Sequence, residues 1–322
     1  MTINNIFFLI IFIFFKIYST QEIITNSNTK YSDGFGSQFH EIISTIIYAE
    51  LNNKKFVYTP FKEMDHNYKE DSDFISKKEW LTNFTGNFEL TQHKFNKTNK
   101  RTEFFNENIE KCSKSESLKK IKKIFRANKN IKNYFSNKAA GESSETDQSN
   151  PAFAPSTCKT STDRQGGVYP EHVEGAGYSP NTNPRDKARS VLATENKNFN
   201  IAIHVRRPNS HDTRTEGTDL PNKFYLNIIN NLRNLYKAEN LLFHIFSQGD
   251  IKNFKVFESK DTILHLDESI EDTFCSMVFA DMLIVGPSSF SYVAGILSEN
   301  LVYYIPFVLL NPLPHWKSVE KF

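Results

Sequence analysis

The C-terminal part of the chain alternates between short apolar runs and amphipathic segments, and this pattern limits the possible folds more than any other feature. The segments follow in the order strand 199–203, helix 222–236, strand 241–246, strand 262–266, helix 271–279, strand 281–285, helix 290–297 and strand 301–305. Strands that alternate with helices favour a parallel, doubly wound sheet, because each crossover helix packs on a face of that sheet. We therefore expect an α/β fold.

The N-terminal part shows a shorter version of this pattern. Apolar residues at 42–51 recur at helical spacing, and 54–58 is typical of a strand. Residues 71–137 are charged, interspersed with Phe and helical in pattern, most clearly at 118–125. A chain of 322 residues is long enough for two modest α/β domains, each with a hydrophobic core. We expect an N-terminal α/β domain at 30–137 and a C-terminal one at 197–322.

The segment between these two domains differs in composition. No isoleucine occurs between Ile131 and Ile201, and Ala, Gly, Ser, Thr and Pro are frequent there. This segment has too little apolar periodicity to form a core. We expect residues 138–196 to be a low-complexity insertion or linker, either disordered or extruded at the surface.

The N-terminal segment contains an unbroken apolar run, Ile6–Phe15, which is followed by Lys16. A membrane-spanning helix needs about 20 apolar residues, so a run of this length suits the core of a signal peptide better than an anchor. We expect residues 1–20 to be a signal peptide or membrane anchor, and the protein to lie in the secretory pathway or at a membrane. If the segment has no such function, a cytoplasmic location follows.

Charge and cysteine content exclude several classes of function. The net charge of +2 gives no reason to expect a nucleic-acid partner. Cys112, Cys158 and Cys275 are scattered without metal-ligand spacing, and an odd number leaves one thiol unpaired in any disulfide scheme. We expect neither a metal site nor a disulfide framework.

Two adjacent arginines follow the first apolar strand of the C-terminal domain. His204-Val205-Arg206-Arg207 comes directly after Ile203. Ligands of open α/β sheets bind beyond the carboxyl ends of the strands, and arginine binds phosphate through a planar fork. The pair therefore suits a diphosphate site. The alternative is an ordinary strand end whose arginines are solvated or paired with carboxylates.

A second anion-seeking element follows the strand 281–285. Gly286-Pro287-Ser288-Ser289 lies between this strand and the next helix, where free amides and hydroxyl groups can bind an anion. The alternative is ordinary helix capping by serine. Because both elements lie at strand ends of one predicted sheet, together they suggest a nucleotide diphosphate.

These residues resemble a known family. His204-Val205-Arg206-Arg207 is similar to the His-x-Arg-Arg motif of the α1,2- and α1,6-fucosyltransferase and protein O-fucosyltransferase superfamily. The glycine-bearing turn 33–38 resembles that superfamily's N-terminal Gly-x-Gly-Asn-Gln loop, and 280–292 resembles its late strand and Ser-rich turn. The three motifs occur in the family's order, and glycosyltransferase family 11, the α1,2-fucosyltransferase-like group, is the most similar branch.

The resemblance implies a GT-B fold of two Rossmann-like domains, a GDP-fucose donor and a glycan or glycoconjugate acceptor. It implies inversion at the anomeric carbon without an essential metal or other cofactor. By position it assigns the β-phosphate to Arg206, with Arg207 beside it and His204 in the donor site. It gives catalytic roles to Arg206, His204 and Ser37. The other donor-binding positions that it implies are Gly34, Gly36, Asp272, Ser288, Ser289 and Phe290.

The chain departs from the family's pattern at three positions. Pro208 and Asn209 stand where the family has Gly-Asp, and Ser37 stands where it has a catalytic asparagine. Two alternatives therefore stay open: a secreted or surface binding protein that keeps the fold without turnover, and a transferase that uses another nucleotide sugar. The neighbours His40 and Glu41 have the residue types of an acid–base pair, but their helical position favours a helix face.

Overall fold

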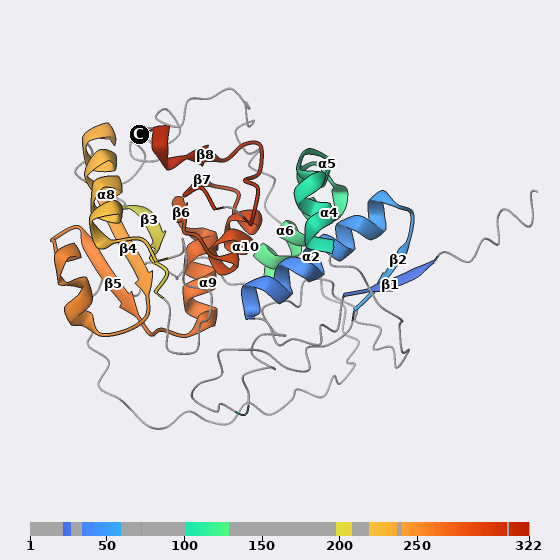
Figure 1. The fold of residues 1–322 in the computed structure, drawn as a ribbon, viewed down its shortest axis with the longest axis horizontal. Helices are drawn as coiled ribbons and strands as arrows, with labels where there is room; N and C mark the ends of the chain where they lie inside the picture. Colours follow the sequence, from blue (N-terminus) through green and yellow to red (C-terminus); the bar gives the residue numbers. More distant parts are fainter. Residues whose placement is uncertain are drawn as a thin grey trace, which may run out of the picture.

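The computed structural model of the chain describes residues 22–26, 34–58, 72, 101–128, 198–207, 219–236, 240–307 and 309–321. Its main feature is a six-stranded parallel sheet (Figure 1). The strands are β3 (Phe199–His204), β4 (Leu241–Ser247), β5 (Thr262–Leu266), β6 (Met282–Val285), β7 (Leu301–Tyr304) and β8 (Lys317–Ser318). This arrangement confirms the predicted parallel α/β architecture.

The strand order of the sheet fixes where a ligand is expected. The order is β5-β4-β3-β6-β7-β8, which is 3-2-1-4-5-6 when the strands are counted from β3. Along the chain, β3, β4 and β5 lie side by side in one direction, and β6 then pairs with the other edge of β3. The topological switch point, where Rossmann-like sheets bind ligands, therefore lies between the carboxyl ends of β3 and β6.

Helices cover both faces of the sheet. They are α8 (Asn222–Tyr236), the 3₁₀ helix η2 (Ile251–Phe257), α9 (Ile270–Phe279) and α10 (Ser289–Leu297). Ile201 and Ile203 share a core with α8 and η2, whereas Ala202 shares a core with α9 and α10. The alternation of side chains along β3 thus buries the strand on both faces, which explains its continuous apolar sequence.

The N-terminal elements begin with a β-α-β unit. Its parts are β1 (Ile23–Thr25), α2 (Phe35–Leu51) and β2 (Lys55–Val57), and the two strands pair in parallel. The described residues 101–128 form the helices α4 (Arg101–Glu107), α5 (Ile109–Ser113) and α6 (Glu116–Asn128). The strand expected at 54–58 and the amphipathic helix expected at 118–125 are therefore confirmed.

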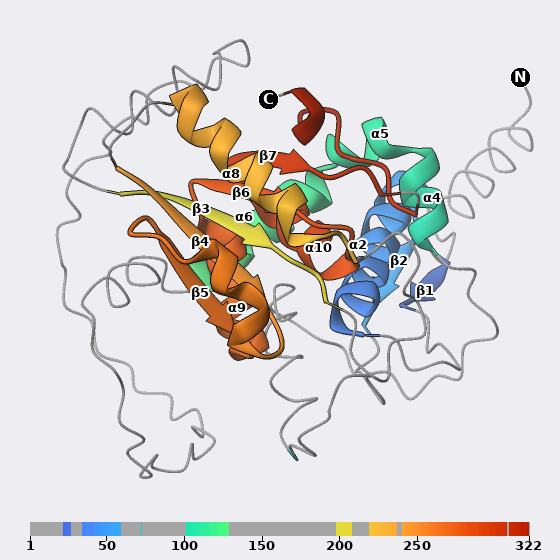
Figure 2. The same ribbon diagram turned by 60° about the vertical axis from the view of Figure 1, so that its left-hand side comes forward.

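The N-terminal helices and the parallel sheet share a hydrophobic core. Figures 1 and 2 place α2 beside α10, and α6 also packs on this side of the sheet. The Phe39 and Phe125 rings lie 5.7 and 5.9 Å from the ring of Phe274 on α9. Through this core the N-terminal helices pack against α9 and α10. Helix α2 therefore has a fixed position next to the switch point.

Two carboxylates of α2 hold the helices that follow it. Glu41, a buried residue, accepts hydrogen bonds from the first backbone amides of α4: Arg101 N at 2.9 Å and Thr102 N at 3.2 Å. Glu50, an exposed residue, binds the first amides of α6 in the same way: Glu116 N at 3.0 Å and Ser117 N at 2.8 Å. Each carboxylate satisfies free amides and complements the helix dipole.

We expect Glu41→Ala to destabilise the protein by about 2 kcal/mol, because the amides at the start of α4 lose a charged acceptor that is buried. Glu50→Ala is the matched control, since water can replace an exposed carboxylate, and we expect a loss of about 0.5 kcal/mol. Urea denaturation of both variants measures the difference. Equal losses would show that burial does not set the strength of these contacts.

A chain of polar side chains crosses the sheet and ends at the start of α9. Asn200 Oδ1 lies 3.1 Å from His244 Nε2, and His244 Nδ1 lies 2.9 Å from His265 Nε2. His265 Nδ1 in turn lies 2.8 Å from a carboxylate oxygen of Glu268. The three ring and amide groups are buried, so these contacts satisfy polar atoms that water does not reach.

Several expectations lie outside the described residues. These include the signal peptide or anchor at 1–20 and the insertion at 138–196. Among the helices that the structure describes, none has the length and apolar character needed to cross a membrane.

Candidate functional site

The two strand ends of the switch point lie in direct contact. β3 and β6 are neighbours, with Ile203 opposite Ile284, so His204 and Gly286 follow at the same edge of the sheet. A Cβ atom on Gly286 would lie 2.4 Å from the carbonyl oxygen of His204. Only glycine permits this approach, which brings the arginine-bearing turn beside the serine-bearing turn.

Helix α10 begins at this edge and is capped by Ser288. The Ser288 Oγ atom accepts a hydrogen bond from Phe290 N at 3.3 Å, and Ser289 is the first helical residue. The capping role is one of the two interpretations that the sequence offers for this serine. The remaining first-turn amides keep the positive end of the helix dipole at the switch point.

Helix α2 begins earlier than the sequence suggests. We expected residues 33–38 to form a turn, but Gly34 is the N-cap and α2 runs from Phe35. The Gly34 carbonyl already accepts hydrogen bonds from Ser37 N at 3.1 Å and Gln38 N at 3.2 Å. Ser37 therefore lies in the first turn of α2, where it is partly buried, and Asp33 lies outside the described residues.

The reason for glycine at position 36 is the contact with α10. A Cβ atom on Gly36 would lie 2.4 Å from Phe290 N and 2.6 Å from the carbonyl carbon of Ser289. The first turns of α2 and α10 thus touch through their backbones. Neither first turn contains an acidic residue, whereas those of α4, α6 and α9 each do. Two helix N-termini without an acidic residue in the first turn therefore meet at the carboxyl edge of the sheet.

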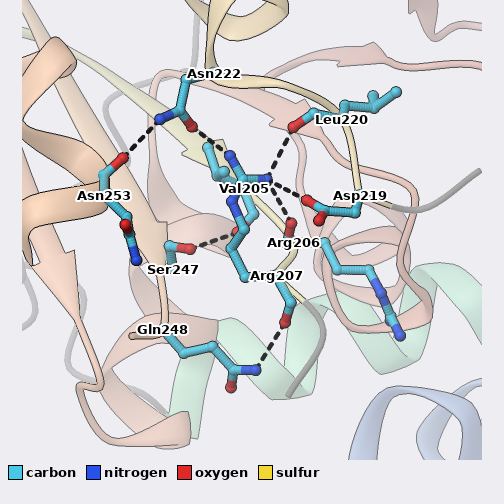
Figure 3. Close-up of polar contacts among 9 residues, drawn as sticks. All are labelled: Val205, Arg206, Arg207, Asp219, Leu220, Asn222, Ser247, Gln248 and Asn253. Atoms are coloured by element: carbon cyan, nitrogen blue, oxygen red, sulfur yellow. Dashed lines mark hydrogen bonds and ion pairs between the residues drawn. The ribbon is translucent and has the colours of Figure 1, made fainter. Parts of the chain in front are cut away.

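The two arginines of the motif point in opposite directions (Figure 3). The guanidinium of Arg207 turns toward the start of α8 and contacts Asp219, Leu220 and Asn222. Arg206 extends away from that cluster and is partly buried. The structure therefore separates the two residues that the sequence pairs in one clamp.

His204 lies against the start of α10. Its ring centroid is 5.8 Å from that of Phe290, in an edge-on arrangement. Burial lowers the pKa of His204 to about 3, and the nearby charge of Arg206 acts in the same direction. The imidazole is therefore neutral at physiological pH. Its buried Nδ1 atom has no hydrogen-bond partner among the residues that the structure describes.

Phe290 belongs to an aromatic cluster near the carboxyl edge of the sheet. Its ring centroid lies 6.2 Å from that of Phe35 and 5.5 Å from that of Phe274. The cluster includes rings from α2, α9 and α10, so it fixes the start of α10 relative to the start of α2.

Asp272 lies in the first turn of α9, which follows the carboxyl end of β5. Its Oδ2 atom accepts a hydrogen bond from Ser269 Oγ at 2.9 Å, and Ser269 Oγ accepts one from Asp272 N at 3.0 Å. The carboxylate is exposed at the same edge of the sheet as Arg206. The structure does not place it in contact with the arginine-bearing turn.

The positions that follow the double arginine in sequence, Pro208 and Asn209, lie outside the described residues. Within the described ranges, no group of three His, Cys, Asp or Glu side chains is arranged to hold a metal ion. His40 and Glu41 do not form an acid–base pair at this edge. Glu41 caps α4, and the His40 ring packs against Phe105 and Tyr292.

Sequence reasoning missed the residues that surround the arginine-bearing turn. Ser247 and Gln248, at the end of β4, contact the backbone of Val205 and Arg207. A signal was present, because polar residues directly after a buried strand are expected at the same sheet edge as the β3 end.

No protein-family model matches this sequence, and no curated protein matches it either.

Proposed function

We propose that this chain is a glycosyltransferase that binds a nucleotide diphosphate sugar at the switch point between β3 and β6, with GDP-fucose as the expected donor. The observation that carries the proposal is the contact between the first turns of α2 and α10 beside the Arg206 turn. Two positive helix ends and one guanidinium suit a diphosphate, which carries its charge on two adjacent groups.

The chemistry follows from the charges at this edge. Transfer of a sugar leaves the nucleoside diphosphate with additional negative charge. Fixed amides and a guanidinium stabilise that charge without reorganising, which is electrostatic stabilisation of the transition state. Neutral His204 adds no charge, and its ring extends the apolar wall that Phe290 begins.

The proposal includes the two-domain GT-B arrangement. In this arrangement the parallel sheet binds the donor, and the β1-α2-β2 unit begins the domain that faces the acceptor, a glycan or glycoconjugate. Arg206 then contacts the β-phosphate, while Gly34, Gly36, Ser289 and Asp272 lie around the nucleotide.

A second candidate is a binding protein that retains the nucleotide site without turnover. The observation that favours it concerns the carboxylates of α2, the helix that contains Ser37. Glu41 and Glu50 are both used to cap α4 and α6, so neither is available as a general base. Ser37, which replaces the family's asparagine, has a shorter reach toward a substrate.

A thermal-shift panel of GDP, GDP-sugars, UDP and UDP-sugars tests the donor site. At a hundredfold excess over Kd, a ligand stabilises the folded state by about 2.7 kcal/mol, which is a rise in Tm of several degrees. We expect this rise with GDP and GDP-fucose, and we expect it to disappear in Arg206→Met. Selective stabilisation by UDP-sugars would indicate another donor, and no shift with any nucleotide would refute the proposal.

Release of GDP from GDP-fucose in the presence of glycan acceptors then separates the two candidates. A transferase releases GDP much faster when an acceptor is present than when water alone can accept the sugar. A protein that binds GDP-fucose and never releases GDP across an acceptor panel fits the binding protein instead.

A further inference from the structure

The Arg207 guanidinium is surrounded by oxygen atoms of the protein. Its Nη1 atom lies 2.8 Å from the Arg206 carbonyl oxygen, 2.9 Å from that of Leu220 and 3.0 Å from Asp219 Oδ1. Its Nη2 atom donates to Asn222 Oδ1 (Figure 3). Only about a fifth of the side chain is exposed, at 19%. The fork of this arginine is thus occupied by the chain itself.

The backbone of the turn is held at each of its three carbonyl groups. Ser247 Oγ donates to the Val205 carbonyl at 2.7 Å, and Gln248 Nε2 donates to that of Arg207 at 2.8 Å. Arg207 itself donates to the carbonyl of Arg206, which lies between them. Every carbonyl from 205 to 207 therefore accepts a side-chain hydrogen bond.

Arg207 also connects this turn to α8 and η2, which cover one face of the sheet. Asn222, the first residue of α8, accepts from Arg207 and donates through Nδ2 to the Asn253 carbonyl at 2.6 Å. The rings of Tyr225 and Phe254 lie 5.9 and 5.8 Å from the guanidinium carbon. Arg207 thereby fixes the turn to α8 and to η2.

We infer that Arg207 is a positioning residue, which holds the backbone of the turn so that Arg206 is oriented toward the switch point. The inference rests on the proposed function in one respect, namely that Arg206 binds an anionic group there. A rigid backbone matters because a preorganised cation loses less entropy when it binds a diphosphate. Lysine cannot replace it, since a single ammonium lacks the planar fork that spans these acceptors.

The first arm of the test needs no ligand. Hydrogen–deuterium exchange is measured on peptides that cover 198–207 and 219–226 in the wild type, Arg207→Met, Arg207→Lys and Arg206→Met. We expect exchange to rise about tenfold or more in both Arg207 variants, because charged hydrogen bonds are lost, and to stay unchanged in Arg206→Met.

Arg233→Met is the matched control for this arm. Arg233, also on α8, contacts both Asp261 oxygens at 2.6 and 2.8 Å, and Ser259, at the opposite end of the helix. This variant removes another arginine contact of α8, which also includes several side-chain hydrogen bonds. It should leave exchange at 198–207 unchanged, and unchanged exchange in Arg207→Met would overturn the inference.

The second arm is a double-mutant cycle on GDP affinity, measured by calorimetry. We expect Arg207→Met to weaken binding about tenfold and Arg206→Met about a hundredfold. The double variant should bind as Arg206→Met does, because a residue that acts through Arg206 has nothing left to position. Additive losses would show that Arg207 contacts the nucleotide itself, and would also overturn the inference.

The two arms keep the inference separate from the proposed function. A wild type that binds no nucleotide diphosphate refutes the proposed function, while the exchange arm still decides whether Arg207 holds the turn. A wild type that binds GDP, with no change in exchange and additive losses in the cycle, leaves the proposed function intact and refutes the positioning role.

Discussion

Replacing Gly36 with alanine is expected to destabilise the protein by about 3 kcal/mol, because the added methyl group overlaps the backbone of α10. In an ordinary helix the same change stabilises by about 1 kcal/mol, since alanine has the higher helix propensity. The expected sign is therefore the opposite of the usual one. The sign of the effect thus tests whether α2 and α10 touch as the structure shows.

The overlap cannot be relieved by rotating a side chain. The atoms nearest to a Cβ on Gly36 are the backbone N and Cα of Phe290, at 2.4 and 2.5 Å. These atoms begin α10, and the Phe290 amide is fixed by Ser288 Oγ. Relief requires one helix to move away from the other, which also separates the two positive helix ends of the candidate site.

Chemical denaturation of Gly36→Ala measures this effect, and Ser37→Ala is the matched control. Ser37 is the next residue of the same helix, and its replacement adds no atom against the backbone of α10, so we expect a change of only about 0.5 kcal/mol. If Gly36→Ala proves as stable as the wild type, or more stable, then the close contact of the two helices is refuted.

Much of the fold was predictable from local pattern. Helix α8 and strand β5 have the bounds that apolar periodicity predicts. Helix α8 buries one apolar face, and β5 pairs with β4 along its whole length. Some of the short elements were not predicted. Strand β8 has only two residues, and η2 lies where no strong periodicity exists. Such elements form because tertiary contacts surround them, so their sequences contain little signal.

The sequence predicts which segments form the candidate site, but it does not predict how their side chains are arranged. The α/β pattern places the Arg206 turn and the Gly286 turn at one edge of the sheet, and the strand order of the structure makes them neighbours. The separate directions of Arg206 and Arg207 do not follow from it. They depend on Asp219 and Asn222, which approach from the start of α8, and no local pattern in 204–207 identifies those partners.

The second large effect is expected in the free energy of unfolding at acidic pH. His40 is buried between Phe105 and Tyr292, with ring centroids 5.1 and 5.2 Å away, and burial lowers its pKa to about 3. Burial and the charge of Arg206 lower the pKa of His204 to the same range. Both imidazoles are therefore neutral in the folded protein across the range where an unfolded chain protonates them.

The sign of the pH dependence follows from these pKa values. Between about pH 3 and pH 6.5 the unfolded chain binds a proton at each histidine and the folded protein does not. The stability that depends on the two neutral imidazoles is fully present above about pH 6.5, and it is lost as the pH falls toward 3. Each histidine adds a slope of about 1.4 kcal/mol per pH unit, or about 2.7 kcal/mol for the two together.

His40→Leu isolates one of these two slopes, because leucine fills the site without a titrating group. Unfolding free energies at several values between about pH 5 and pH 6 avoid the range where carboxylates such as Glu50 protonate. We expect the slope in this variant to be smaller than in the wild type by about 1.4 kcal/mol per pH unit.

Phe105→Leu is the control, because it weakens the packing around the same imidazole without removing a titrating group. A lower stability with an unchanged slope is expected for it. If His40→Leu keeps the wild-type slope, then His40 does not stay neutral in the folded protein. The contact of α2 with α4 and α10 would then be open enough for water to reach the ring, which contradicts the close packing that also places Gly36 against Phe290.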